Sequence, residues 1–161
     1  MDVQQVQTEL IDTYRQDFSK YAPYSDKRCL NDVLSGVAGS VGQQIKYTHL
    51  SDGFVSATIK KAVTLLQTAR IVNKVEATSP AGLPLAANVN PKKFKALLLD
   101  IGLLTRLSGL SLAVEYQKDQ LLSMFKGALA EQFVGQEFLA NGQEVLYYLS
   151  LIHISEPTRP Y

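Results

Sequence analysis

The stretch SATIKKAVTLLQTARIVNKVEATSPAGLP, residues 56–84, decides how the middle of this chain folds. Its first half places apolar side chains three and four positions apart, which is the spacing of one helix face. The inward-facing residues of this predicted helix are Ile59, Ala62, Val63, Leu66 and Ala69. Ser56 precedes them, and serine is a favoured capping residue. We therefore predict a helix with Ser56 as its N-cap.

The second half of the stretch predicts a strand and a loop. From Ile71 to Ala77 the residues alternate in the manner of a β-strand, and proline and glycine in residues 79–84 favour a loop. Upstream, residues 45–50 are short and partly extended in pattern, and Ser51-Asp52-Gly53 is a turn signal.

Two helices are expected before this stretch. The first places a run of apolar residues on one face, namely Val3, Val6, Leu10, Tyr14, Phe18 and Tyr21. Ala22-Pro23 ends it, because the residue before a proline disfavours the α conformation. The second helix runs from near Asp26 to about Ser40. Helices followed by a strand and a loop are typical of a winged helix, so we predict a helical, winged-helix-like segment over residues 1–90.

The character of the sequence changes after Asn88–Pro91, where we place a domain boundary, with a second unit over residues 91–148. Its predicted elements are a buried strand over 94–100, a short helix over 101–107, a long helix over 118–140 and a strand over 144–148. The predicted apolar face of the long helix consists of Leu122, Phe125, Leu129 and Phe133. Strand, helix and strand in this order are typical of an α/β domain, here only its truncated start. The predicted fold class is mainly α with minor β.

Composition narrows the function classes. The chain has 46% hydrophobic and 19% charged residues, as a soluble globular protein has, and 16 basic against 15 acidic residues give a net charge of +1. This balance argues against a strongly electrostatic binder of nucleic acid or anionic membranes, although it leaves room for a local basic patch. No stretch is apolar enough to span a bilayer, and no membrane partner is expected. A single cysteine, Cys29, cannot form an internal disulfide, so we expect a buried inert thiol in the cytoplasm.

Five separate strings carry a resemblance to a known family. In chain order they are THLSDG (48–53), ATIKKAVTLLQTARIV (57–72), TSPAGLPLAA (78–87), KKFKALLLDIGLL (92–104) and GALAEQFVGQE (127–137). They resemble the C-terminal half of prokaryotic AAA-type ATP-binding proteins, over about residues 3–148. The resemblance implies a parent with an ATPase module first, then a winged-helix segment, then a domain of unknown function with a PD-(D/E)XK nuclease-like fold. It implies ATP and Mg²⁺ as cofactors of that parent.

The chain does not contain the chemistry of such a parent. No G-x-x-x-x-G-K-[ST] phosphate loop is present, so we expect no cofactor to bind this chain. The expected function is a non-catalytic fragment of an AAA-family ATP-binding protein, not an enzyme, with the rest of the parent ATPase as its partner. The final stretch LSLIHISEPTRPY, residues 149–161, resembles a translated transposase sequencing adapter. We therefore expect no function for these residues.

Glu131 is the one candidate for nuclease chemistry. By resemblance it would be the helix-borne acid, whereas the acidic strand and the E-x-K strand would lie beyond Tyr148. Because Mg²⁺ needs several oxygen ligands, one carboxylate cannot hold it, and a structural role is favoured. A remnant nuclease completed by another chain is the less favoured alternative. Asp100 could be a second polar group near that site, but an aspartate that caps a strand or the next helix is favoured.

Four basic residues are candidates for contact with nucleic acid, as an alternative function of a DNA-binding winged-helix module. Lys60, Lys61, Arg70 and Lys74 sit on or after the presumed recognition helix, where they could touch DNA phosphates. The alternative is a solvated helix face, which the near-zero net charge favours. His49 has no partner at ligand spacing, so we expect a structural histidine.

Overall fold

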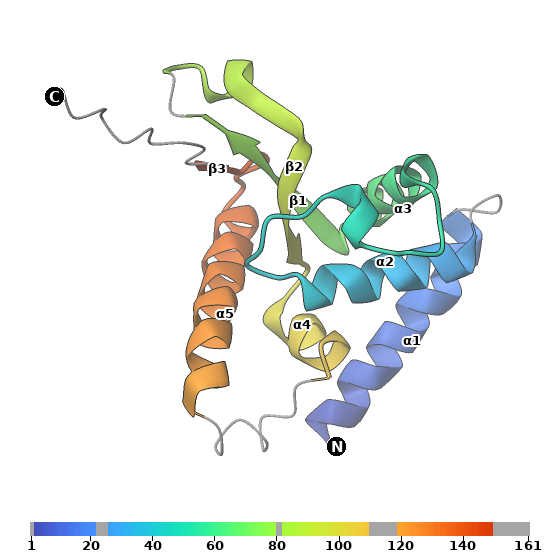
Figure 1. Cartoon of the computed structure of the whole chain (residues 1–161). Helices are drawn as coiled ribbons and strands as arrows, with labels where there is room; N and C mark the ends of the chain where they lie inside the picture. The colour runs from blue at the N-terminus through green and yellow to red at the C-terminus, as the bar shows by residue number, and fades with distance from the viewer. Residues whose placement is uncertain (1, 22–25, 80–81, 110–118, 150–161) are drawn as a thin grey trace, which may run out of the picture.

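The computed structural model describes residues 2–21, 26–79, 82–109 and 119–149, and the adapter-like stretch after Leu149 lies outside the described residues. The chain is mainly helical with one small sheet, which confirms the predicted fold class at that level (Figure 1). The elements are α1 (Val3–Tyr21), α2 (Lys27–Gly39), η1 (Tyr47–His49), α3 (Ser56–Thr68), β1 (Val72–Thr78), η2 (Leu85–Asn88), β2 (Val89–Leu98), α4 (Ile101–Leu107), α5 (Asp119–Ala140) and β3 (Tyr147–Leu149).

The three strands lie in the order β2-β1-β3. β1 and β2 form an antiparallel hairpin that begins with Val72 opposite Leu98, and β3 pairs parallel to β1. The strands predicted over 71–77, 94–100 and 144–148 are therefore confirmed, although β2 begins earlier, at Val89, and β3 is shorter than expected.

Helices cover both faces of the sheet. α2 and α3 lie on one side and α5 on the other, as Figure 1 shows. The first side holds the main core, to which the sheet contributes Val72, Phe94, Ala96 and Leu98. On the second side Gly135 of α5 lies against the Leu97 side chain, so the helix approaches the sheet closely.

Aspartate side chains cap α2 and α4, and of these two caps Asp100 was predicted. Asp26 accepts from the Arg28 amide at 2.8 Å at the start of α2, and Asp100 accepts from the Leu103 amide at 2.8 Å at the start of α4. The Ser56 prediction is wrong. The backbone carbonyl of Val55 already accepts from the amides of residues 58 and 59, so Val55 is the N-cap of α3 and Ser56 its first helical residue.

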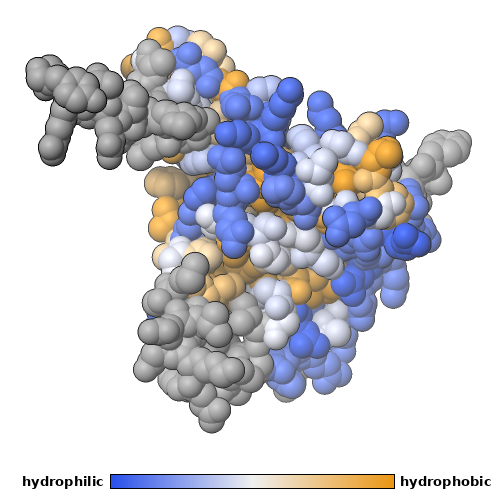
Figure 2. Space-filling view, in the orientation of Figure 1, coloured by the Kyte–Doolittle hydropathy of each residue, from blue (hydrophilic) through white to orange (hydrophobic). Residues whose placement is uncertain are grey.

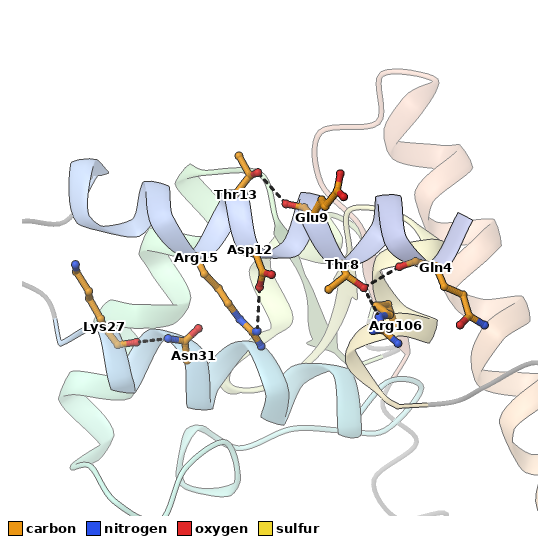
Figure 3. Close-up of polar contacts among 9 residues, drawn as sticks. All are labelled: Gln4, Thr8, Glu9, Asp12, Thr13, Arg15, Lys27, Asn31 and Arg106. Atoms are coloured by element: carbon orange, nitrogen blue, oxygen red, sulfur yellow. Dashed lines mark hydrogen bonds and ion pairs between the residues drawn. The ribbon is translucent and has the colours of Figure 1, made fainter. Parts of the chain in front are cut away.

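The predicted apolar stripe of α1 needs correction. Val3, Val6 and Leu10 are 68%, 42% and 41% exposed, whereas Ile11 and Phe18 are buried. α1 instead holds its neighbours partly through polar groups, as Figure 3 shows. The Arg106 Nε of α4 donates to the Thr8 hydroxyl at 2.9 Å, and Arg15 points from α1 toward α2. Helical spacing tells which residues share a face, but not how far the neighbouring helices extend along it.

The inward face of α5 also differs from the prediction. Phe125 and Leu129 pack against the core, but Phe133 is 51% exposed, and the Leu122 side chain lies outside the described residues. Gln132 and Gly135 occupy the buried positions instead. The division at residue 90 stays a prediction about domains. In the structure β1 lies before this boundary and β2 runs across it, and the two strands share one ladder and contribute to one core.

Candidate functional site

A hollow lined by three lysines lies beside the start of α3. It measures about 500 Å³, and its lining is Lys46, Tyr47, Thr48, Ser56, Asn90, Lys92 and Lys93. No acidic side chain is among these residues. The remaining groups are neutral hydrogen-bonding side chains, so the hollow as a whole is cationic.

A single backbone bridge brings the lysines together from distant parts of the sequence. The Ile45 amide donates to the Phe94 carbonyl at 2.7 Å, and the Phe94 amide donates back at 3.3 Å. Lys46 follows one partner and Lys93 precedes the other, so the antiparallel bridge places these two residues next to each other. The extended pattern predicted for residues 45–50 is confirmed at Ile45, whereas residues 47–49 form η1.

A bulge in β2 displaces the other lysine of the hollow from the ladder. Glu76 of β1 pairs with Phe94, but the next residue, Ala77, pairs with Asn90. The three residues 91–93 are therefore extra on the β2 side. Pro91 has no backbone N–H, so its position outside the ladder leaves no donor unpaired. The Asn90 side chain accepts from the Lys92 amide at 3.0 Å. Bulges of this kind turn side chains away from the direction they would have in a regular strand.

A second hollow lies along α3. It measures about 540 Å³ and is lined by Ala57, Lys60, Lys61, Thr64 and Leu65. Because Ser56 lines the first hollow and Ala57 the second, the two are neighbours at the first turn of the helix. We call the five lysines at positions 46, 60, 61, 92 and 93 the lysine surface. Figure 2 shows hydrophilic residues where the chain between α2 and η1 crosses in front of β2.

The lysine surface carries uncompensated charge. None of its five ammonium groups forms an ion pair with another residue that the structure describes. Lys93 is half-buried and the other four are exposed. The structure thus brings the predicted pair Lys60 and Lys61 together with three lysines that the sequence did not single out.

The other two predicted basic residues lie apart from this surface. Arg70 has a left-handed backbone, with φ of 58°, and lines a different hollow of about 650 Å³ that it shares with α5 residues such as Gln136. The Lys74 side chain is only 12% exposed; its Nζ pairs with Glu76 at 3.0 Å and lies 5.3 Å from the centre of the Phe94 ring. Its charge is already compensated within the protein.

Glu131 lies on the opposite side of the sheet from the lysine surface. Both of its carboxylate oxygens accept from Lys95 Nζ, at 2.9 and 2.7 Å. The same Nζ lies 5.4 Å from the centre of the Tyr148 ring. The Tyr148 hydroxyl is buried and has no hydrogen-bond partner among the described residues. Its burial raises the pKa of Tyr148, and the negative charge of Glu131 raises it further.

The donor set around Glu131 does not fit the Mg²⁺ that the resemblance implies for the parent. Both carboxylate oxygens already bind a lysine, and Mg²⁺ needs oxygen ligands in near-octahedral array. The part of the chain that the structure describes has no group of three or more His, Cys, Asp or Glu that could hold a metal ion. Glu131 joins α5 to β2 in the way of a structural residue.

A buried glutamine makes the backbone hydrogen bonds that a neighbouring strand would make at Leu98, on the edge of β2. Gln132 is fully buried, its Oε1 accepts from the Leu98 amide at 2.9 Å, and its Nε2 donates to the Leu98 carbonyl at 2.8 Å. Sequence reasoning missed this role. The only signal was a polar residue between apolar ones on the long helix, which is common on solvent faces.

His49 and Cys29, which were also considered in the sequence, differ in exposure. His49 is exposed on η1. Cys29 is buried, as predicted, and burial raises the pKa of its thiol, with further contributions from Asp26 and Asp32.

A family model described as "Domain of unknown function (DUF8612)" matches residues 1–113. The chain belongs to this family. The matched region of the DUF8612 domain contains the whole lysine surface, whereas Glu131 lies outside it. Neither the curated proteins nor the solved structures gave a match. No helix among the described residues is long and apolar enough to cross a membrane.

Proposed function

We propose that this chain is a non-catalytic, winged-helix-like module of an AAA-type ATP-binding protein and that it works in contact with the rest of that parent. The order of elements supports this proposal. α2, the Ile45 bridge, η1, α3 and the β1–β2 hairpin follow one another as the elements of a winged helix do. The five strings that resemble the parent family give the second support. ATP and Mg²⁺ are then ligands of the parent, bound outside this chain.

Nucleotide binding by the isolated chain tests this assignment. Purified protein is titrated with Mg²⁺–ATP while its thermal unfolding midpoint is followed, because a ligand that binds the native state raises that midpoint. We expect no shift up to millimolar nucleotide. A saturable rise at micromolar ATP would overturn the proposal.

A second candidate function, binding of duplex DNA, is favoured by one observation. Lys60 and Lys61 project from exposed positions of α3 and have no ion-pair partner among the described residues. In a winged-helix-like module this helix would lie against the duplex, where lysines contact phosphates and fix the position of the protein. DNA cleavage is not part of the proposal, because Glu131 is held by Lys95.

Fluorescence anisotropy with a labelled duplex tests this candidate. Reversing two charges in Lys60→Glu with Lys61→Glu is expected to weaken binding at low salt by at least about tenfold, since each lost phosphate contact removes counterion release. The matched control is Lys27→Glu with Lys126→Glu, which changes the net charge equally at exposed positions on α2 and α5. Binding that survives the first variant, or that is lost equally in the control, would exclude α3 as the contact.

A further inference from the structure

We infer that Lys46, Lys92 and Lys93 form the second half of a DNA-binding surface and hold the phosphate backbone of a duplex beside Lys60 and Lys61. This inference rests on the proposed DNA-binding function and deepens it. It adds contacts from the chain segment before η1 and from the bulge of β2 to those from α3. None of these three lysines was evident as a contact from the sequence.

The charges at the hollow favour an anionic occupant. Lys46 and Lys93 stand beside each other at the Ile45–Phe94 bridge, and like charges placed opposite each other across strands repel. Among the described residues that line the hollow, no acidic side chain offsets that repulsion. An anion between the ammonium groups removes it, so the hollow favours an anionic occupant.

The backbone that carries these lysines is held in place by buried residues. Ile45 and Phe94 are 1% and 0% exposed, and the Phe94 ring packs against Tyr47 with ring centres 5.0 Å apart. The Asn90 side chain fixes the bulge through the Lys92 amide. The lysine stems cannot separate by moving the main chain without opening the core. The site is therefore preorganised, which lowers the cost of ordering on binding.

The arrangement and the lining of the two hollows indicate which kind of anion they bind. Two cationic hollows side by side suit a polymer with regularly repeated phosphates better than a single small anion. Thr48, Ser56 and Asn90 offer additional hydrogen-bonding groups of the kind that contact DNA backbones. Single strands are held by bases stacked on exposed aromatic rings. The one aromatic residue of the lining, Tyr47, already packs on Phe94, so the surface favours a duplex.

The salt dependence of duplex binding tests this inference. The triple variant Lys46→Gln, Lys92→Gln, Lys93→Gln is compared with wild type and with the control Lys20→Gln, Lys27→Gln, Lys126→Gln, which loses the same charge at exposed positions elsewhere. Because each phosphate contact contributes about 0.9 to the slope of log K against log salt, we expect the triple variant to lower that slope by about two to three. Its Kd at low salt should rise at least about tenfold, with little change in the control. Circular dichroism checks that every variant is folded.

The outcomes separate the inference from the function on which it rests. If the triple variant binds like wild type while Lys60→Glu with Lys61→Glu weakens binding, DNA binding stands and this inference falls. If wild-type protein does not bind a duplex at low salt, both fall. Equal weakening in the control triple would show attraction to net charge alone and overturn the inference. Tighter binding to vesicles of phosphatidylserine than to a duplex would overturn it in favour of a membrane surface.

Discussion

At the residue scale, the surroundings of Tyr148 affect how the stability of the protein depends on pH. Its hydroxyl is buried with no partner among the described residues, beside the ion pair of Lys95 with Glu131. The pKa of Tyr148 is raised, so the folded state holds this proton more tightly than the unfolded state does. The stability that follows is fully present below the ordinary tyrosine pKa and is lost as the pH rises through the higher pKa of the folded protein.

Replacing Glu131 by glutamine should lower the pKa of Tyr148. The substitution removes the negative charge that disfavours tyrosinate and leaves the positive charge of Lys95 nearby, while burial keeps part of the shift. The chain has eight tyrosines, so the measurement is a tyrosinate absorbance titration of each protein minus the same titration with Tyr148→Phe added. An unchanged pKa would show that Glu131 and Tyr148 do not interact.

The caps and the ion pair show what single residues reveal in advance. Asp100 was predicted as a cap because the amide it accepts from lies only three residues away, and the cap at Asp26, which was not predicted, is equally local. Lys95 was not predictable as the partner of Glu131, because 36 residues separate them and only the packing of α5 on the sheet joins them.

At the element scale, one glycine sets the distance between α2 and the segment after η1. A Cβ built on Gly36 would lie 2.5 Å from the Leu50 carbonyl oxygen, a backbone atom that cannot turn aside. A Cβ on Gly39, near the end of the same helix, would meet nothing within 4 Å. The sequence did not predict this contact, because close approach of a distant backbone leaves no local signal.

The two glycines form a matched pair of substitutions. Gly36→Ala should destabilise the protein by about 1–3 kcal/mol, the usual cost of overpacking, although alanine favours helix. Gly39→Ala gains the helix propensity without the clash and should be neutral or stabilising by up to about 1 kcal/mol. Urea unfolding followed by circular dichroism measures both. Similar values for the two variants would contradict the close contact.

The periodicity of the sequence predicted where most helices and strands lie, but not how they pair or pack with one another. The helices over 27–39 and 101–107 and the strand over 72–78 follow from spacing and from turn residues. The bulge of β2 does not, because it is a difference in register between two strands, and register is a property of the pair.

At the scale of the whole molecule, charge is unevenly distributed. A net charge of +1 comes from 16 basic and 15 acidic residues, yet the five lysines of the lysine surface stand together without acids among the residues lining its two hollows. The composition gives only the net charge of the chain and does not show where the charged residues lie in the fold. Lys60 and Lys61 could be predicted from α3, whereas Lys46 joins Lys92 and Lys93 only through a bridge between residues 45 and 94.

The Cys29 thiol should report on the unfolding of the whole core. It is 1% exposed between other buried residues of α2, and its raised pKa lowers the fraction of reactive thiolate. We expect Ellman's reagent at pH 8 to label the native protein at least about a hundredfold more slowly than the urea-unfolded protein. The labelling rate should rise with urea in parallel with global unfolding. Fast labelling in buffer alone would mean that α2 opens locally.

The Gln132 side-chain amide occupies one edge of the sheet and so affects where another strand can pair. One border, along β2, is closed at Phe94 by the Ile45 backbone and at Leu98 by a single side chain that imitates a neighbouring strand. At the opposite border β3 has a partner on one side only among the described residues. An incoming strand would find the bonding positions of Phe94 and Leu98 taken at the first border, so pairing with an added strand is hindered at these two residues.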